Sequence, residues 1–461
     1  MTDRRLRLAA SREAGGLSSS EARAVLLRDL SVPASTVDGL PDGVVVALAR
    51  TLRPGAGRRV AASRENAYDI LEHDDVFVGR LRRNDFARRV ELDGRGLDDF
   101  GLLTIARELS TRYGPSFPTG VVHEASLLIA GKSAFHPLRD YLSALTWDGV
   151  PRLQDACKTI LTVDDFIAGY HDRVLALFCI QAVRRIFEPG CKADHVLVLE
   201  GDQGIGKSSF VRRLAGDENF SDADVDLRSK DAAMALTGGV WIWELPELAG
   251  LNRHESEQIK AFLTQQVDSF RPPYGRCVEN HPRQWSAVAT TNISQWLRDD
   301  TGGRRFWPVY CRRIDLDALN NLRDRLWGEA VHRYRAGEAA FFTPGDRAPA
   351  RQQAQRHAVD PWHDVVVRHL LGRWPSIAEL EAARATEPVR VAPGHLLTDA
   401  LHVPVHLQNQ AAVARLVAVL RTLGFKRRQV REAARRRWTY QADDFEKLAA
   451  ALFGEQQEAD T

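Results

Sequence analysis

The sequence predicts an α/β fold whose central part is a parallel β-sheet with crossover helices. Between residues 195 and 310, short apolar runs alternate with stretches of helical apolar spacing. This alternation is typical of parallel strands joined by helices. The run Val196–Leu199 leads directly into a glycine-containing loop, and the stretch Ser208–Ala215 then reads as a helix that ends at Gly216. A buried strand, a loop and a helix therefore begin this sheet.

The loop has the G-x-x-x-x-G-K-[ST] spacing of a phosphate-binding loop. Glycine backbone can wrap closely around a triphosphate and point its N–H groups inward. Lys207 is expected to reach the β- and γ-phosphates, and the Ser208 hydroxyl to bind Mg²⁺. A chance match is the alternative, but the flanking strand and helix disfavour it. We predict ATP and Mg²⁺ as ligands, with nucleotide contacts from Gly201, Asp202, Gln203, Gly204, Ile205, Gly206, Lys207, Ser208 and Ser209.

Two acids follow a second candidate strand. Val240–Trp243 is apolar, and Glu244 and Glu247 come directly after it. A carboxylate at the end of a strand beside the loop strand is where the Walker B acid of such sites lies. Glu244 is predicted to bind the metal together with Ser208, and Glu247 to polarise the attacking water. The alternative is that one or both are ordinary surface acids.

A third apolar run, Trp285–Thr290, is followed by Thr291 and Asn292. An amide at this point can sense the γ-phosphate and orient water, although asparagine also commonly ends strands as a turn residue. Arg304 and Arg305 follow a Gly-Gly turn and suit an arginine finger that neutralises charge in a neighbouring subunit. A solvated turn or an internal salt bridge is the alternative for the arginines.

Between the second and third strands, residues 270–283 read as a strand, a proline turn and a second strand. Arginines alternate here with a tyrosine, a combination that suits a sugar-phosphate backbone. A packed hairpin with a basic edge is the alternative. The predicted DNA contacts are Arg271, Tyr274, Arg276 and Arg283.

The C-terminal part contains a basic segment. Residues 421–438 hold eight Lys or Arg and one Glu, a net charge of +7. Helical spacing over 411–423 precedes a basic turn, and residues 437–440 are strand-like, with Phe425, Trp438 and Tyr440 nearby. This order suggests a small winged-helix-like domain. A solvated helix face is the alternative. The predicted DNA contacts are Lys426, Arg427, Arg428, Arg431 and Arg435.

The 461 residues predict several domains. We expect a mostly helical N-terminal accessory region (1–130), a helical lead-in (131–190), an ATPase core (191–345) and the C-terminal domain (361–461). Residues 162–187 have helical apolar spacing up to Pro189. Five scattered cysteines favour a reducing cytoplasm, and no apolar run reaches the roughly 20 residues that span a bilayer.

Many motifs, in order, resemble the virulence-associated E (VirE or VapE-like) family of phage, plasmid and pathogenicity-island proteins. These are P-loop ATPases of the AAA+/superfamily-3 helicase type, related to phage primase-helicases. The resemblance implies an ATPase core that forms a homo-oligomeric ring, with Glu244 as the Walker B acid, Asn292 as the sensor and Arg304 or Arg305 as the finger. It also implies that residues 271–283 form the DNA-contacting hairpin. The motifs include LTWDGVPRL (145–153), WELPEL (243–248), FRPPYGR (270–276), TTN (290–292) and GRRFWP (303–308).

The resulting functional hypothesis is an ATP-hydrolysing ring that moves along single-stranded or forked DNA in the replication of a mobile element. A different class is a nucleotide-gated DNA-binding or anti-phage defence ATPase that does not unwind DNA. A small-molecule kinase also uses such a loop, but the Asn292 sensor and the basic C-terminal segment disfavour it.

Overall fold

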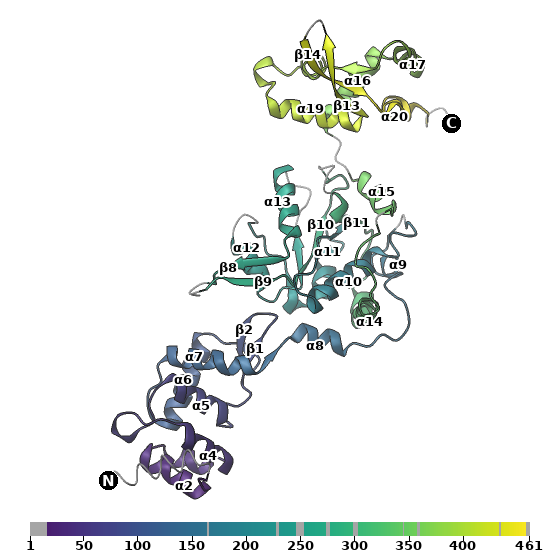
Figure 1. Ribbon diagram of the computed structural model, residues 1–461. Helices are drawn as coiled ribbons and strands as arrows, with labels where there is room; N and C mark the ends of the chain where they lie inside the picture. Colours follow the sequence, from purple (N-terminus) through teal and green to yellow (C-terminus); the bar gives the residue numbers. More distant parts are fainter. Residues whose placement is uncertain are drawn as a thin grey trace. The chain divides into compact units, whose positions relative to one another are not determined.

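The computed structural model describes residues 16–163, 166–226, 230–245, 253–272, 277–297, 303–343, 345–356, 360–432 and 435–457. The chain divides into two compact units, Met1–Arg356 and His357–Thr461 (Figure 1). In the described residues, no helix has the length and apolar character needed to cross a membrane.

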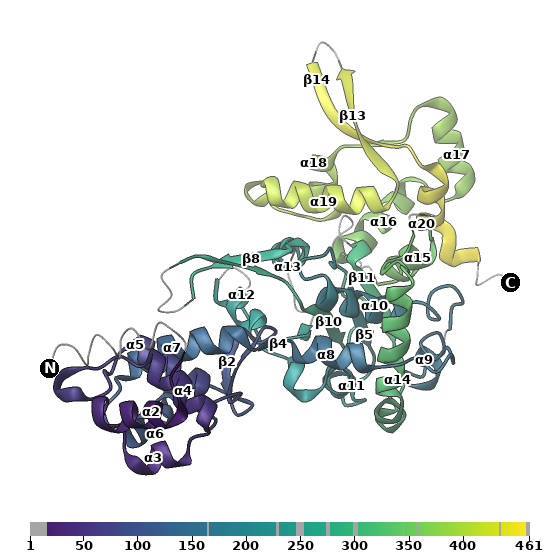
Figure 2. The same ribbon diagram turned by 60° about the horizontal axis from the view of Figure 1, so that its bottom comes forward.

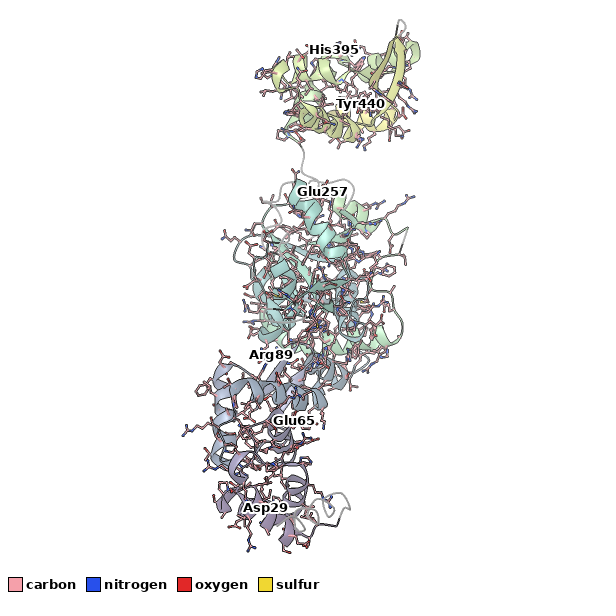
Figure 3. The ribbon with its side chains drawn as sticks, turned by 60° about the vertical axis from the view of Figure 1, so that its left-hand side comes forward. Asp29, Glu65, Arg89, Glu257, His395 and Tyr440 are labelled. Atoms are coloured by element: carbon pink, nitrogen blue, oxygen red, sulfur yellow. The ribbon has the colours of Figure 1, made fainter. Side chains whose placement is uncertain are left out.

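The N-terminal region of the first unit is mostly helical, as predicted, and has a core of its own. Its side chains, including the labelled Asp29, Glu65 and Arg89, are drawn in Figure 3. A four-stranded sheet of order β3-β2-β1-β4 lies beside the helices, and β1 and β2 pair antiparallel. The elements are α2 (Ser19–Ala24), η1 (Val25–Asp29), α3 (Ala34–Gly39), α4 (Asp42–Thr51), η2 (Ala56–Arg58), α5 (Arg64–His73), β1 (Leu81–Asn84), β2 (Arg89–Leu92), β3 (Arg95–Gly96), α6 (Asp99–Tyr113), α7 (Thr119–Lys132) and β4 (Ala134–Phe135).

The lead-in to the central sheet consists of α8 (Pro137–Ala144), α9 (Ala156–Thr159) and α10 (Val174–Phe187). The helix expected over 162–187 begins only at Val174, so the first part of that prediction is wrong. Gly169 has a φ of +80°, a left-handed conformation that an α-helix cannot contain. From Val174 onward the segment is almost wholly apolar, and α10 is correspondingly buried.

The central sheet has five parallel strands in the order β11-β5-β10-β7-β6. This confirms the parallel sheet expected from the sequence. The strands are β5 (Val196–Glu200), β6 (Phe220–Ser221), β7 (Ile242–Leu245), β10 (Ser286–Thr291) and β11 (Phe306–Tyr310). The connecting elements are α11 (Lys207–Ala215), η3 (Asp217–Asn219), α12 (Lys230–Thr237), α13 (Arg253–Thr264) and η5 (Gly303–Arg305), followed by α14 (Leu316–Arg335) and α15 (Ala348–Ala354).

Helices cover both faces of this sheet. Leu197 and Leu199 of β5 pack into a core with residues of α10, α11 and α14. Val196 and Val198, which point the other way, pack with residues of α12 and α13. Every residue of β5 is buried, as expected for a parallel strand with helices on both faces.

A two-stranded hairpin separates α13 from β10. Its strands are β8 (Val267–Phe270) and β9 (Glu279–Pro282), paired antiparallel. The structure therefore confirms two paired strands around the predicted turn, although the first strand begins earlier than predicted and ends at Phe270. Residues 273–276, at the turn, lie outside the described residues.

The second unit packs helices against a three-stranded sheet of order β12-β14-β13. Its elements are α16 (Pro361–Arg373), α17 (Ile377–Thr386), β12 (Arg390–Val391), α18 (Pro393–His395), η6 (Leu396–Ala400), η7 (Val405–Leu407), α19 (Gln410–Thr422), β13 (Phe425–Glu432), β14 (Arg435–Ala442) and α20 (Phe445–Gln457). The predicted helix before the basic segment is α19. The basic segment itself is no turn: it forms most of a hairpin of two eight-residue strands, which extends away from the helices in Figure 2.

Candidate functional site

The register of the central sheet brings three strand ends to one edge. Thr291 of β10 and Tyr310 of β11 both pair with Glu200, the last residue of β5. Leu245, the last residue of β7, pairs with Ala289 on β10. Side chains just beyond these carboxyl ends therefore meet, and open α/β sheets bind their ligands at this edge.

The loop after β5 requires glycine at specific positions. Gly201 has a φ of +140°, and a Cβ built there would lie 2.2 Å from the carbonyl oxygen of Cys311. Gly206, with a φ of +95°, immediately precedes α11. The first N–H groups of a helix have no intrahelical acceptor, so the start of α11 offers donors to an anion. The predicted strand and helix around the loop are both confirmed.

Lys207 lies at the centre of the site. Its Nζ donates to the carbonyl oxygens of Gly201 and Asp202, both at 2.7 Å, and to Oδ1 of Asn292 at 2.8 Å. Burial lowers the pKa of the Lys207 ammonium below the ordinary lysine value. The structure thus joins two predicted residues that are far apart in sequence, one from the loop and one from the end of β10.

Ser208 and Glu244 form a second pair beside Lys207. The Ser208 hydroxyl donates to Oε1 of Glu244 at 2.7 Å, and the Thr290 hydroxyl donates to the same oxygen at 2.8 Å. Glu244 is buried, and its other oxygen, Oε2, has no hydrogen-bond partner among the residues that the structure describes. A buried carboxylate oxygen without a partner beside a serine hydroxyl fits a hard divalent cation such as Mg²⁺. Sequence reasoning missed Thr290, although it belongs to the Thr-Thr-Asn segment.

The other predicted loop residues line the outer part of this edge. Asp202, Gln203, Gly204 and Ser209 are exposed, and Ile205 is half-buried. Glu247 lies outside the described residues, so its role as a base stays a prediction.

A buried ion pair supports the base of the loop. The Glu200 carboxylate accepts hydrogen bonds from Nη2 of Arg356 at 2.9 Å and from Nε1 of Trp296 at 2.6 Å. The carbonyl oxygen of Arg356 accepts from the backbone N–H of Leu297. Arg356 therefore links the end of β5 to the segment after β10. No local signal in the sequence could have identified a partner 156 residues away.

The two predicted finger arginines differ in their surroundings. Arg305 is mostly buried, lies 3.4 Å from Asp194 and donates to the hydroxyl of Thr264. This is the internal salt bridge that the sequence left open as an alternative. Arg304 is exposed. Both precede β11, whose first residue, Phe306, pairs with Val196. They therefore lie at the edge of the sheet opposite the loop 201–206.

The predicted DNA contacts of the β8–β9 hairpin fall into three cases. Arg271 is exposed, whereas Tyr274 and Arg276 lie outside the described residues. Arg283 contradicts the prediction: its side chain is wholly buried, and it donates to both carboxylate oxygens of Asp268 at 2.7 Å. Its guanidinium also lies over the rings of Phe262 and Trp285. Arg283 therefore anchors the hairpin, and its buried side chain is not available for the predicted DNA contact.

The predicted DNA contacts of the second unit lie on β13 and β14. Lys426 and Arg428 are exposed and both pair with Asp443, at 3.7 and 2.6 Å. The hydrogen bond from Arg428 holds the pKa of the Asp443 carboxyl below its usual value. Arg427 instead stacks on Trp438, with 3.9 Å between its guanidinium carbon and the ring centroid. Arg431 and Arg435 continue the two strands towards the turn.

Comparisons with known proteins identify a family for the central part of the chain. Residues 142–359 match the Virulence-associated protein E-like domain, which confirms the family resemblance drawn from the sequence motifs. No curated protein matches the chain.

Solved structures that are similar to this chain include the apo structure of the NrS-1 C terminal region (305-718). It has 10% sequence identity and a TM-score of 0.46, and the alignment covers 78% of this chain and 95% of that chain. An A form apo structure of the same region has 12% identity and a TM-score of 0.42, with 82% and 99% covered.

Proposed function

We propose that this chain, whose residues 142–359 form a virulence-associated protein E-like domain, binds ATP and Mg²⁺ at the loop 201–208 and hydrolyses the nucleotide. Hydrolysis would drive movement along single-stranded or forked DNA in the replication of a mobile genetic element. The observation that carries the proposal is one cluster at the carboxyl edge of the parallel sheet. There Lys207 contacts Asn292, and Ser208 contacts the buried Glu244.

Each group of the cluster has a role that its contacts support. Lys207 would exchange its present carbonyl acceptors for phosphate oxygens, which carry more negative charge. Because Oδ1 of Asn292 accepts from Lys207, its amide N–H groups are the ones that would donate to the γ-phosphate or to the attacking water. Thr290 and Ser208 hold one oxygen of Glu244, so the other remains directed to the metal or to a water. Mg²⁺ bound by Ser208 and Glu244 would neutralise developing phosphate charge.

The position of Arg304 supports a site shared between subunits. It lies at the amino end of β11, whereas the loop lies at the carboxyl end of the neighbouring strand β5. A five-residue strand separates these edges by roughly 15 Å, at about 3.3 Å per residue. Arg304 therefore lies far from a nucleotide bound to its own subunit. Its side chain is exposed, so a neighbouring subunit has access to it. We infer a homo-oligomeric ring in which Arg304, rather than the internally paired Arg305, is the finger.

The second unit supports DNA binding. Its sheet order is β12-β14-β13, and α19 comes directly before the hairpin. This order supports the proposal of a winged-helix-like domain whose wing would be β13–β14. The wing carries Lys426, Arg427, Arg428, Arg431 and Arg435, cations that suit phosphate contacts. In the first unit, the exposed Arg271 begins the segment towards the turn of β8–β9, and Tyr274 and Arg276 belong to the same proposed contact surface.

The test is ATP hydrolysis by Lys207→Ala, with and without single-stranded DNA. Lys192→Ala is the matched control, because Lys192 is an exposed lysine of the same unit. We expect Lys207→Ala to lose hydrolysis and Lys192→Ala to keep it, with unchanged circular dichroism. Hydrolysis by Lys207→Ala at the parent rate would refute the nucleotide site. Opening of a forked duplex by the parent protein distinguishes a helicase from a nucleotide-gated binding or defence ATPase.

Subunit mixing tests the shared site. Arg304→Ala and Lys207→Ala proteins, each inactive alone, should regain activity when mixed, because one interface then combines an intact loop with an intact finger. No recovery at any ratio, with assembly confirmed by light scattering, would show that Arg304 does not act between subunits.

A further inference from the structure

We propose that Trp438 and Arg427 of the β13–β14 hairpin form a stacking platform for an unpaired base of single-stranded DNA. The inference rests on the proposed DNA-binding function and deepens it. It assigns a base contact, and hence a preference for single strands, to a surface otherwise expected to bind phosphates.

The register of the hairpin places both residues on one face. Arg427 pairs with Tyr440 and Gln429 pairs with Trp438, so all four side chains point to the same side of the ribbon. Phe425 and Tyr440, nearer the base of the hairpin, belong to the hydrophobic core of the unit. Trp438 lies two residues closer to the turn than Tyr440. At that point the same face of the hairpin no longer packs against the core.

Exposure distinguishes Trp438 from the other aromatic residues of the unit. It is 52% exposed, whereas Phe425 is 1% and Tyr440 is 7% exposed. Among the Phe, Tyr and Trp side chains described between residues 360 and 453, only Trp438 is exposed. Arg427 lies over the ring at 3.9 Å, and half of the side chain still faces solvent. The indole therefore keeps surface on which a second planar group can stack.

The first two turns of the helix before the hairpin offer few groups that read a base edge. Ala411 and Ala414 lie exposed on α19, and Arg415 donates to both carboxylate oxygens of Asp360. Gln410, at the first position, is the exposed amide of this helix. Recognition of a duplex through the major groove needs several such side chains. Stacking does not need side chains that read a base edge, because every base presents a π-face to an aromatic ring or a guanidinium.

Charge on the opposite face of the hairpin suits the strand that carries the base. Lys426 and Arg428 point to the other side of the ribbon, and they are 71% and 56% exposed although they share Asp443. Electrostatic contacts there would hold the sugar-phosphate backbone. Stacking on Trp438 would add affinity that does not depend on salt, and the two contributions can therefore be measured separately.

The experiment measures binding of fluorescein-labelled (dT)20 by the full chain over a range of salt concentrations. The variants are Trp438→Ala and Trp438→Phe. Val405→Ala is the matched control, because Val405 is an exposed apolar residue of the same unit, 80% exposed, that lies off the hairpin. The other two ligands are a 20-nucleotide abasic strand and a blunt 20-base-pair duplex. ATP hydrolysis without DNA is measured for each protein.

We expect Trp438→Ala to weaken (dT)20 binding by about tenfold, with an unchanged dependence of affinity on salt. Trp438→Phe should keep most of the affinity, and Val405→Ala all of it. The parent and Trp438→Ala should bind the abasic strand equally, and likewise the duplex. Unchanged (dT)20 affinity in Trp438→Ala, or an equal loss on the abasic strand or the duplex, would overturn the stacking platform.

Two failures remain distinguishable. If Trp438→Ala binds (dT)20 like the parent while both bind tightly, only the platform is wrong. If the parent itself binds none of the three ligands, the DNA-binding part of the proposed function is wrong as well. ATP hydrolysis without DNA should stay at the parent rate in Trp438→Ala. Trp438 lies in the second unit, whereas the proposed nucleotide site lies in the first.

Discussion

Substitution of Arg283 should destabilise the first unit and leave DNA contacts untouched. Its side chain is wholly buried, and Asp268, its partner, is 3% exposed. Two hydrogen bonds of 2.7 Å join them, and Arg283 also donates to the carbonyl oxygen of Phe262. Arg283→Met would keep most of the packing volume but leave the Asp268 carboxylate buried without a partner. Loss of one member of a buried pair costs about 3–5 kcal/mol.

The stability of each variant is measured by urea unfolding, which is monitored by circular dichroism. DNA binding is measured separately, at a urea concentration at which each variant is still folded. Arg271→Met is the matched control, because Arg271 is an exposed arginine of the same hairpin segment, and exposed substitutions change stability by about 0.5 kcal/mol or less. Adding Asp268→Leu to Arg283→Met should recover much of the loss, since an apolar pair needs no charge partner. Parent-like stability of Arg283→Met combined with weaker DNA binding would refute this reasoning and restore Arg283 as a surface contact.

Three further predictions concern residues at the carboxyl edge of the central sheet. Gly201→Ala should weaken ATP binding, measured by fluorescent-nucleotide titration, far more than Gly204→Ala, because only at Gly201 does a Cβ meet backbone; equal losses would contradict the loop geometry. Glu244→Gln should retain nucleotide binding but lose turnover, since the amide keeps the hydroxyl contacts without the charge that holds Mg²⁺; proportional loss of both would contradict this role. Arg356→Met should destabilise the first unit by about 3–5 kcal/mol, and adding Glu200→Gln should restore part of it in thermal unfolding, whereas no restoration would show that the buried charge is not the cause.

The local sequence determined the elements that surround the glycine-containing loop 201–206. The apolar run of β5, the glycine spacing and the helix α11 are all encoded within about twenty residues, because apolar runs, loop glycines and helix ends leave patterns in the local sequence. The presence of β7, β10 and the β8–β9 hairpin was also predicted, although β7 begins two residues later and β8 three residues earlier than predicted. The helix over 162–187 was predicted too long because its apolar spacing continues across Gly169, whose left-handed conformation the spacing does not reveal.

Tertiary structure alone decided which charged and aromatic side chains are available. Arg283 and Arg271 look equivalent in sequence, yet one is buried against Asp268 and the other is exposed. Likewise, Tyr440 and Trp438 share a strand face, but only the first lies where that face still meets the core. Burial depends on where a strand lies within the packed layers and on partners distant in sequence, such as Lys207 and Asn292, which the parallel register brings together. Periodicity in the chain specifies a face, whereas the packing of the whole fold specifies what that face meets.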